Sequence, residues 1–440
     1  MGGSAFGNGP GAPYTPRMPT AIYHHVRSSV HSALREIFIC VATPIEGPAK
    51  KDHGDLDVLV CQERRMLFPD ASDHMGAPRT NHELMLIVKG RLGAEKAIVN
   101  GPTANLLICW PEGFENGMNG HEGEDEKEKH VQVDVRICKD FDQLSWNLFK
   151  HAHGDLWNLI GSTIRPFGFT VDEEALWVRI PEIENYNKKG AKVLLTRDPT
   201  ETIHFLGMQV EGFWEQPFPS AEALFEYATT CRMFWVKPTA EEEADEGDAG
   251  VMGGEEGRKK LKHNDRRRMK GRPVYRQWTN EYIPRLRAEG KFLSNGQDLI
   301  VLREKLKDEA VAWFSIEAEY NEKLRGWRVK RSVEEVKGLV KALIPTELDY
   351  QYRAAVMVAL RRTLLEDDRS LGFAVPPTTR GSDGIYNAEA VRDFISENWK
   401  QLGDVAWEIQ KAKNSEHMKL KAQKRNAEEE VGPARVAASP

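Results

Sequence analysis

The sequence has few cysteines and no long apolar run, and these absences exclude several classes of protein. Its 5 cysteines in 440 residues show none of the paired spacings of zinc ligands or disulfide frameworks, so we expect buried thiols in a reducing compartment. No apolar stretch approaches the ~18 residues of a membrane span, and residues 1–17 form a Gly/Pro-rich start without the apolar core of a signal peptide. We therefore expect an intracellular protein, nuclear or cytoplasmic, with no membrane partner.

Charge is patterned rather than present in large excess. A net charge of −6 argues against a surface that binds nucleic acid uniformly. Residues 241–256 are acidic and Gly-rich without periodicity, which predicts a disordered linker at 239–262. A dense basic block follows the acidic run, and it includes Arg266, Arg267, Arg268, Lys270 and Arg272. Such a block is typical of a grip on nucleic-acid phosphates or of a nuclear import signal, and a solvated helix face balanced by the adjacent acids is an equal alternative.

The most informative stretch is residues 54–60, in which Asp55 and Asp57 alternate with apolar side chains. In an extended strand this alternation directs both carboxylates to one face while the apolar residues enter a core. Asp134 lies in a second alternating run and adds a third carboxylate if the two strands are neighbours. Converging carboxylates repel one another unless cations neutralise them, and hard oxygen ligands suit Mg²⁺ or Mn²⁺. The pattern is typical of two-metal phosphoryl transfer, although an isolated Asp-x-Asp pair is more often structural.

The order of elements around this motif carries a family resemblance. A helix at residues 22–34 and an apolar strand at 37–42 precede the motif, and a further helix and two strands separate it from Asp134. In this order, and in the turn and strand from Thr43 to Val60, the chain resembles the palm of family X DNA polymerases, the polymerase beta group of the nucleotidyltransferase superfamily. The resemblance covers about residues 20–208. It implies an α+β fold with a mixed sheet.

The resemblance also implies roles for individual residues. Asp55 and Asp57 would bind both metal ions, and Asp134 would bind the catalytic one. The segment from His151 to Asp155, followed by Trp157-Asn158, matches the place of an aromatic-aromatic-Thr-Gly-Ser and Phe-Asn signature. The nucleotide-binding positions implied in this way are Thr43, Lys50, Lys51, His151, Gly154, Asp155, Asn158 and Arg165.

Several working positions depart from the family pattern. The turn that holds the triphosphate carries Ala42, Thr43 and Glu46 where the family has Gly, Ser and Arg, so a negative charge stands where phosphate would lie. Lys50 and Lys51 are either replacements for that lost cation or part of a solvated loop. Asp155 stands where the family has Ser. The places of the bulky aromatic pair beside the sugar are occupied by His151 and Ala152, which predicts weak discrimination against ribonucleotides.

The resemblance implies transfer of a nucleoside monophosphate from an NTP or dNTP to a 3′-hydroxyl of DNA or RNA, with Mg²⁺ or Mn²⁺. A catalytically impaired nucleotidyltransferase-fold binding module or scaffold is the alternative that Glu46 favours. Transfer to a protein or small molecule is a third hypothesis. Acceptor, template use, base and sugar preference and oligomeric state stay open.

The expected domain organisation follows from these observations. The boundaries are a disordered N-terminus at 1–17, a nucleotidyltransferase palm and nucleotide-binding region at 18–238, the linker at 239–262, an all-helical C-terminal domain at 263–412 and a charged tail at 413–440. Within the helical part, Ser332 to Glu335 has the pattern of a capping box, which predicts a helix that begins there and ends before Pro345.

Overall fold

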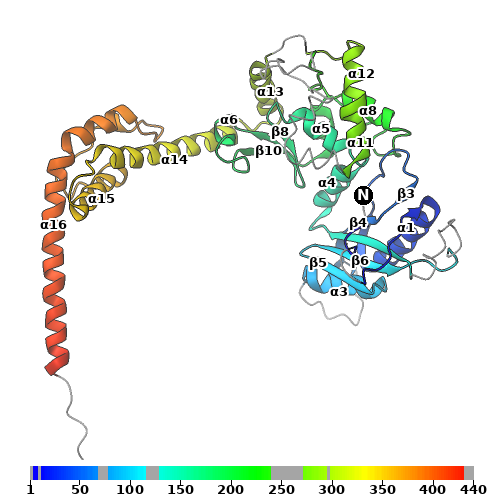
Figure 1. Cartoon of the computed structure of the whole chain (residues 1–440), viewed down its shortest axis with the longest axis horizontal. Helices are drawn as coiled ribbons and strands as arrows, with labels where there is room; N and C mark the ends of the chain where they lie inside the picture. The colour runs from blue at the N-terminus through cyan, green and yellow to red at the C-terminus, as the bar shows by residue number, and fades with distance from the viewer. Residues whose placement is uncertain are drawn as a thin grey trace, which may run out of the picture. The chain divides into compact units, whose positions relative to one another are not determined.

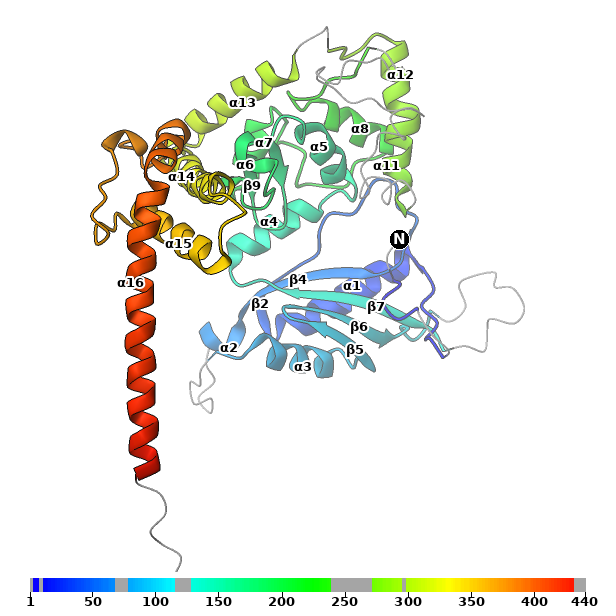
Figure 2. The same cartoon turned by 60° about the vertical axis from the view of Figure 1, so that its left-hand side comes forward.

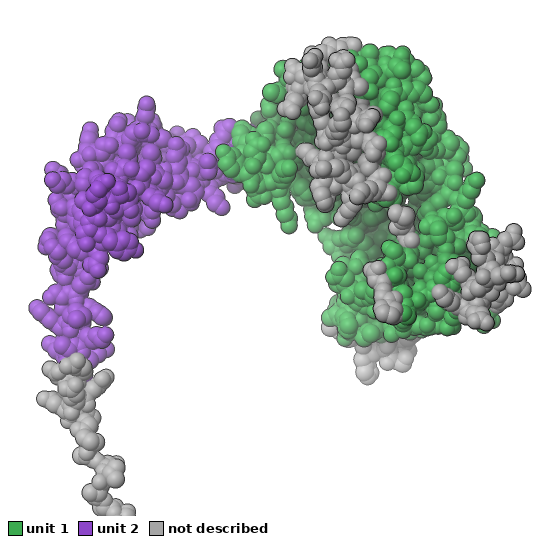
Figure 3. Space-filling view, in the orientation of Figure 1, with its two compact units in different colours: residues 1–317 green, residues 318–440 purple. Residues whose placement is uncertain are grey.

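A computed structural model describes residues 3–7, 11–67, 78–114, 128–238, 271–294 and 298–430, with only the helical backbone of residues 425–430. The chain divides into two compact units, residues 1–317 and 318–440 (Figures 1 and 3). All named strands belong to the first unit, and the second is built from helices. The expected α+β class, with a mixed sheet and a helical C-terminal region, is therefore confirmed.

A five-stranded sheet forms the base of the first unit. Its strand order is β2-β4-β7-β6-β5, and β4 pairs with β7 in parallel while the other pairs are antiparallel. Its strands are β2 (Phe38–Ala42), β4 (Leu56–Glu63), β5 (Lys96–Asn100), β6 (Thr103–Cys109) and β7 (His130–Ile137). A two-stranded ribbon of β1 (Met18–Pro19) and β3 (Asp52–His53) lies outside this sheet.

One face of the sheet packs against α1 (Thr20–Arg35) and α3 (Asn81–Arg91) (Figure 2). The alternation of β4 and β7 supplies this core, because Leu56, Val58 and Val60 are all fully buried in it. The helix α1 contributes apolar side chains at fourfold spacing, as the sequence predicts. At the start of α3 the side chain of Thr80 and that of Glu83 cap each other's backbone N–H.

The opposite face of β4 and β7 is covered in part by α4 (Phe141–His151). Leu59 and Cys61 of β4 pack there against Leu144 of α4 and against Cys138, which follows β7. The middle of β4 is consequently apolar on both faces, while its beginning keeps one polar face. The site described below lies on that polar face.

Further helices and a small sheet complete the first unit. The antiparallel sheet has the order β10-β9-β8 and consists of β8 (Phe169–Val171), β9 (Leu176–Arg179) and β10 (Lys192–Thr196). The helices are α2 (Arg64–Leu67), α5 (Leu156–Ile164), α6 (Pro181–Glu184), α7 (Pro199–Phe205), α8 (Ala221–Thr229), α11 (Pro273–Gln277), the π-helical turn η1 (Trp278–Tyr282), α12 (Ile283–Ala288) and α13 (Leu299–Trp313). Trp278 and Tyr282 are buried and stacked, which gives these aromatics a core position.

The second unit is helical and has its own core. Its elements are α14 (Glu317–Leu343, whose first residue closes the first unit), α15 (Tyr350–Glu366), the 3-10 turn η2 (Pro377–Thr379) and α16 (Ala388–Glu430). The helix start predicted at Ser332 is wrong. Ser332 lies inside α14, where its Oγ donates to the carbonyl of Val329 and accepts from the N–H of Tyr386. A Ser that bonds back to its own helix can occupy an interior position, and the capping pattern does not distinguish the two cases.

The predicted boundaries meet the structure at several points. Residues 11–17 and 3–7, which the sequence suggests to be disordered, are described, and Phe6 is buried. Residues 271–317 belong to the first unit, and the expected linker at 239–262 lies outside the described residues. The helix α16 continues through residues expected to form a charged tail. None of the described helices combines the length and the apolar character that a membrane span requires.

Candidate active site

The register of the sheet brings the three predicted carboxylates together. Strands β4 and β7 run in parallel with Asp57 opposite Asp134, and Asp55, two residues earlier, immediately precedes β4 and lies close enough for its charge to act on Asp57. All three are on the face of the sheet that is turned away from α1 and α3, because their neighbours Leu56, Val58 and Val133 enter that core. Three carboxylates from two adjacent strands therefore share one polar face.

Neutral hydrogen-bond donors hold two of these carboxylates. Oδ1 of Asp134 accepts from Nδ2 of Asn105 at 2.7 Å and from Nε2 of Gln132 at 2.8 Å. Oδ2 of Asp55 accepts from the backbone N–H of Gly3 at 3.0 Å. Within the described part of the chain, the second oxygen of each aspartate accepts no further hydrogen bond and is available to another partner. Both side chains are thus oriented, and a ligand would meet a fixed set of oxygens.

The electrostatics of the group centre on Asp57. Neighbouring protein atoms displace water from the carboxylate of Asp57, and this desolvation raises its pKa. The charges of Asp55 and Asp134 add to the effect, and the pKa reaches about 7. Burial also raises the pKa of Asp134, against the two hydrogen bonds that lower it. Asp57 is nevertheless exposed to solvent, so water screens part of the repulsion and an ion can reach the carboxylate. A cluster of acceptor-only oxygens that resist ionising together fits a hard divalent cation such as Mg²⁺ or Mn²⁺.

The loop before Asp55 engages the residues that stand in the predicted triphosphate turn. Thr43 Oγ1 lies 2.8 Å from Nε2 of His31, whose pKa burial and the charges of Arg35 and Arg27 lower to about 4. A neutral His31 therefore pairs with the hydroxyl that the sequence assigns to phosphate binding. The hydroxyl of Thr43 can reach phosphate only by sharing or leaving this hydrogen bond.

Glu46 is held by three groups. Tyr23 Oη donates to its Oε1 at 2.5 Å, Lys50 Nζ donates to its Oε2 at 2.5 Å, and Nδ1 of the buried His53 lies 3.7 Å away. Burial opposes ionisation of Glu46, but the interactions with His53, Lys50 and Tyr23 outweigh it and lower its pKa to about 2. The aromatic ring of Tyr23 stacks on that of His53 with centroids 3.8 Å apart. Glu46 therefore organises this loop from within.

The two lysines of the loop behave differently. Lys50 forms an ion pair with Glu46. Its ammonium group is therefore not free to replace the cation that the resemblance would place beside the triphosphate. Lys51 is exposed, and its backbone carbonyl accepts from Thr20 Oγ1 at 3.2 Å. Of the two alternatives stated for these residues, the structure thus gives Lys50 a structural partner and leaves the side chain of Lys51 at the surface.

The segment from His151 to Asp155 lies against the same loop. The backbone N–H of His153 donates to the carbonyl of Ile45 at 2.8 Å, and Gly154 has a positive φ of 65°. A Cβ added to Gly154 would lie 3.2 Å from Cα of Gly47, so this close approach of two loops requires glycine. His153 is buried in the protein interior, where its Nε2 lies 2.7 Å from the carbonyl oxygen of Phe213.

His151 and Ala152 differ in accessibility. His151 is exposed, and its Nε2 lies 3.2 Å from Oε2 of Glu173. Ala152 is fully buried, so it packs in the interior at this point of the chain. A bulky side chain in place of Ala152 would be an overpacking change rather than a test of sugar preference. His151 is the residue of this pair that a nucleotide can contact.

Asp155 receives a residue of the basic block. Arg272 Nη1 donates to its Oδ1 at 2.5 Å, and Asn158 Nδ2 donates to the same oxygen at 3.1 Å. Arg266, Arg267, Arg268 and Lys270 lie outside the described residues. Because Asp155 is buried, Arg272 supplies the positive charge that a carboxylate in this place needs.

Arg165 is not gathered into this group. It follows α5 at the end opposite to Asp155, about 15 Å along the helix axis at the usual rise per residue. There its carbonyl accepts from Nη2 of Arg179 at 2.6 Å, in a cluster that includes Glu184 and Arg303. The backbone of Arg165 therefore contributes to the packing of the small sheet.

The sequence reasoning missed several residues around the site. Gln132 is two positions before Asp134 and shares its face, a signal that strand alternation alone provides. Asn105 could not be found in this way, because it faces Asp134 only through the antiparallel register of β6 with β7. Tyr23 and His53 were likewise invisible as partners of Glu46, since they come from separate elements.

Comparisons with known proteins add no family to this geometry. No protein-family model matches the chain, and no curated protein matches it significantly. The interpretation of the site therefore depends on its own chemistry.

Proposed function

We propose that the chain is a divalent-metal-dependent nucleotidyltransferase with a polymerase beta-like palm, which adds a nucleoside monophosphate from an NTP or dNTP to a 3′-hydroxyl of nucleic acid. The observation that carries the proposal is the parallel register of β4 and β7, which sets Asp57 beside Asp134 with Asp55 on the same face. Asp55, Asp57 and Asp134 would hold the cations, which neutralise charge on a transferring phosphoryl group. Asn105 and Gln132 keep Asp134 in position.

A group of basic side chains beside the carboxylates supports phosphate binding at a place other than the predicted turn. Arg136 follows Asp134 by two residues on the same face of β7, and with Lys150 and His151 of α4 it surrounds Glu173. The nitrogen-to-oxygen distances are 3.6, 3.6 and 3.2 Å. Hydrogen bonding by His151, and the charges of Lys150 and Arg136, lower the pKa of Glu173 to about 2 against burial. One carboxylate thus faces three basic groups. The negative charge of a triphosphate could bind the basic groups that Glu173 alone does not neutralise.

The proposal is tested by incubating the protein with labelled NTPs and dNTPs, Mg²⁺ or Mn²⁺, and a pool of DNA and RNA primers. We expect primer extension that disappears in Asp57→Asn and in Asp134→Asn and persists in Asp142→Asn, an exposed aspartate of α4 outside the site. Extension that persists in both site variants would disprove the assignment of the carboxylates.

The second candidate is a palm-like binding module without transfer activity. It is favoured by Glu46, whose carboxylate occupies the turn expected to bind phosphate and whose partners hold it there. The two candidates differ in one measurement: the module binds a primer without extending it under any of the metal and triphosphate combinations. Triphosphate-dependent labelling of a protein or small molecule instead of a primer would indicate the third hypothesis.

A further inference from the structure

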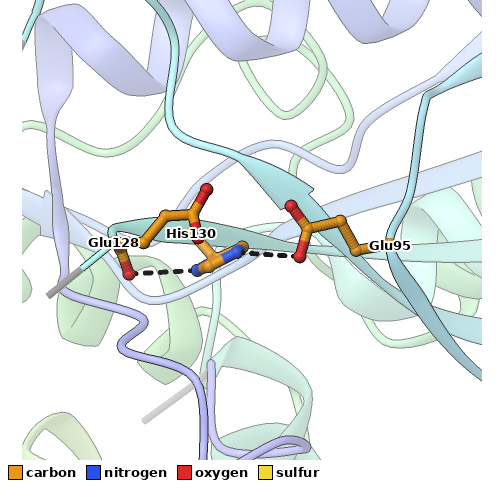
Figure 4. A group of neighbouring side chains, drawn as sticks. All are labelled: Glu95, Glu128 and His130. Atoms are coloured by element: carbon orange, nitrogen blue, oxygen red, sulfur yellow. Dashed lines mark hydrogen bonds and ion pairs between the residues drawn. The ribbon is translucent and has the colours of Figure 1, made fainter.

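A second group of metal-ligating side chains lies beside strands β5, β6 and β7, apart from the candidate active site. Carboxylate oxygens of Glu95 and Glu128 and a ring nitrogen of His130 lie within 4.8 Å of one another, and Figure 4 shows the three side chains converging. Cys109 is not part of this 4.8 Å group, but its thiol lies next to it, because its Sγ donates to Oε1 of Glu95 at 3.2 Å. Imidazole, thiolate and carboxylate are together the ligand types of zinc sites.

The sheet holds these residues in place. Cys109 and His130 are directly opposite each other in the antiparallel pairing of β6 with β7, so their side chains share a face. Glu95 immediately precedes β5, and its backbone N–H donates to the carbonyl of Leu107 at 2.9 Å. Glu128 precedes His130 by two residues. The candidate ligands therefore come from the ends of three hydrogen-bonded strands, and the pairing of these strands fixes their backbone positions.

The hydrogen bonds of His130 direct its second ring nitrogen at a carboxylate oxygen of Glu95. His130 is buried, and its Nδ1 lies 3.1 Å from the backbone carbonyl of Glu128. A carbonyl can only accept, so Nδ1 carries the hydrogen, and in the neutral ring Nε2 is then an acceptor. Nε2 faces Oε2 of Glu95, a second acceptor, at 3.1 Å. Two acceptors at this separation require either a second ring proton or a metal ion between them.

The same arrangement is the usual one for a metal-bound histidine. Such a residue donates its other ring N–H to a backbone carbonyl or a carboxylate, which fixes the tautomer that offers a lone pair to the metal. Zinc bonds of ~2.0 Å to nitrogen and oxygen at a tetrahedral angle place the two ligand atoms about 3.3 Å apart, and a sulfur ligand lies about 3.5 Å from an oxygen. The observed 3.1 Å between Nε2 of His130 and Oε2 of Glu95 comes within a few tenths of an ångström of the first value, whereas Sγ of Cys109 lies 3.2 Å from the other oxygen of Glu95, Oε1.

We propose that Glu95, Glu128 and His130 hold a zinc ion and that the thiol of Cys109, beside Glu95, turns toward this ion as the fourth ligand. With four protein ligands the site is closed, so the ion stabilises the ends of β5, β6 and β7 rather than activating a water molecule. Cys109 and the two glutamates are exposed, which gives the ion a path of entry. His130 and Asp134 lie four residues apart on β7, about 13 Å along the strand, so the two groups of ligands bind separate ions.

The test is a zinc titration of the full chain in excess Mg²⁺, with a chromophoric chelator as competitor. We expect one equivalent of zinc to bind to the wild type, and at least about tenfold weaker binding in Cys109→Ser, Glu95→Gln and His130→Gln. Matched controls are Cys40→Ser, a half-buried cysteine of β2, and Asp57→Asn in the active-site group. Both controls should bind zinc as tightly as the wild type.

Cobalt gives an independent readout. Co²⁺ bound by a thiolate absorbs in the near ultraviolet through sulfur-to-metal charge transfer, and we expect this band in the wild type and in Cys40→Ser but not in Cys109→Ser. Circular dichroism establishes that each variant is folded, and because Cys109 and Glu95 are exposed, their variants keep the test valid if His130→Gln fails to fold. The proposal is overturned if no zinc binds at stoichiometric ratio, if Cys109→Ser keeps the band, or if Asp57→Asn alone abolishes binding.

Discussion

Replacing Glu46 with Gln tests whether this carboxylate organises the loop at residues 43–55 or opposes a triphosphate there. In the folded protein the pKa of Glu46 is about 2, against an ordinary value of 4.5. That depression corresponds to about 3 kcal/mol of stability at neutral pH, and hydrogen bonds to charged groups contribute roughly 1.5–3 kcal/mol. Since the side chain is only 24% exposed, solvent screening removes a minor part of it. We expect Glu46→Gln to cost about 2 kcal/mol at pH 7.

The pH dependence has a definite sign. A carboxyl whose folded pKa is depressed stabilises the protein fully above its unfolded pKa of about 4.5 and loses that contribution as pH falls through about 2. Glu46→Gln has no such group, so the difference in stability between wild type and variant should fall by more than half between pH 7 and pH 3. The apparent melting temperature by calorimetry at pH 7, 5 and 3 measures the difference.

Local opening gives the second assay for the same variant. Hydrogen exchange followed by mass spectrometry should show lost protection in peptides covering residues 43–55, where the bonds from Tyr23 and Lys50 end. Glu83→Gln, which alters only the exposed capping box of α3, should leave these peptides unchanged. The structural role is refuted if residues 43–55 of Glu46→Gln keep wild-type protection and the variant binds triphosphate more tightly. Glu46 would then act only by repelling the triphosphate.

Four further changes are expected to have measurable effects. Asp57→Asn should raise the melting temperature of the metal-free protein and abolish stabilisation by Mn²⁺, because it removes repulsion and a ligand together. Arg272→Gln should increase hydrogen exchange at residues 151–158, since it leaves the buried Asp155 without its cation; unchanged exchange would argue against this role. Changing Arg266–Arg268 to Ala should flatten the salt dependence of nucleic-acid binding by about 0.7–0.9 per lost contact, whereas an unchanged slope with lost nuclear accumulation would reassign the block to import. His151→Ala should shift the ratio of NTP to dNTP use in a competition assay, and a constant ratio would separate His151 from the sugar.

Much of the first unit could be predicted from periodicity. The fourfold spacing in α1 and the alternation in β4 and β7 belong to one core. A strand or helix that buries one face has apolar residues at a regular spacing, so its sequence alone predicts the buried face. The convergence of Asp57 with Asp134 could be expected only conditionally, because their pairing depends on which strands become neighbours across a long stretch of chain. Local patterns contain no information on that register.

The misjudged residues share a physical cause. Cys109 was expected to be a buried thiol because it follows an apolar run, but it closes β6 where the strand leaves the core, and it is exposed. Its partners Glu95 and His130 come from other strands, so no ligand spacing could mark the group. Lys50 was weighed as a phosphate ligand because its partner Glu46 was considered only as a charge out of place. In each case the deciding contact joins elements that are separate in sequence.

The donors around the three carboxylates explain why the group is expected to bind cations rather than to serve as a polar network. Asn105, Gln132 and the N–H of Gly3 are neutral, so they orient oxygens without compensating charge. Among the residues that the structure describes, no lysine or arginine forms an ion pair with Asp55, Asp57 or Asp134, whereas Glu46, Asp155 and Glu173 nearby all have one. A fold that pairs the surrounding carboxylates and leaves these three uncompensated retains a destabilising group, as functional sites do. The uncompensated charge is the feature that a divalent cation would satisfy.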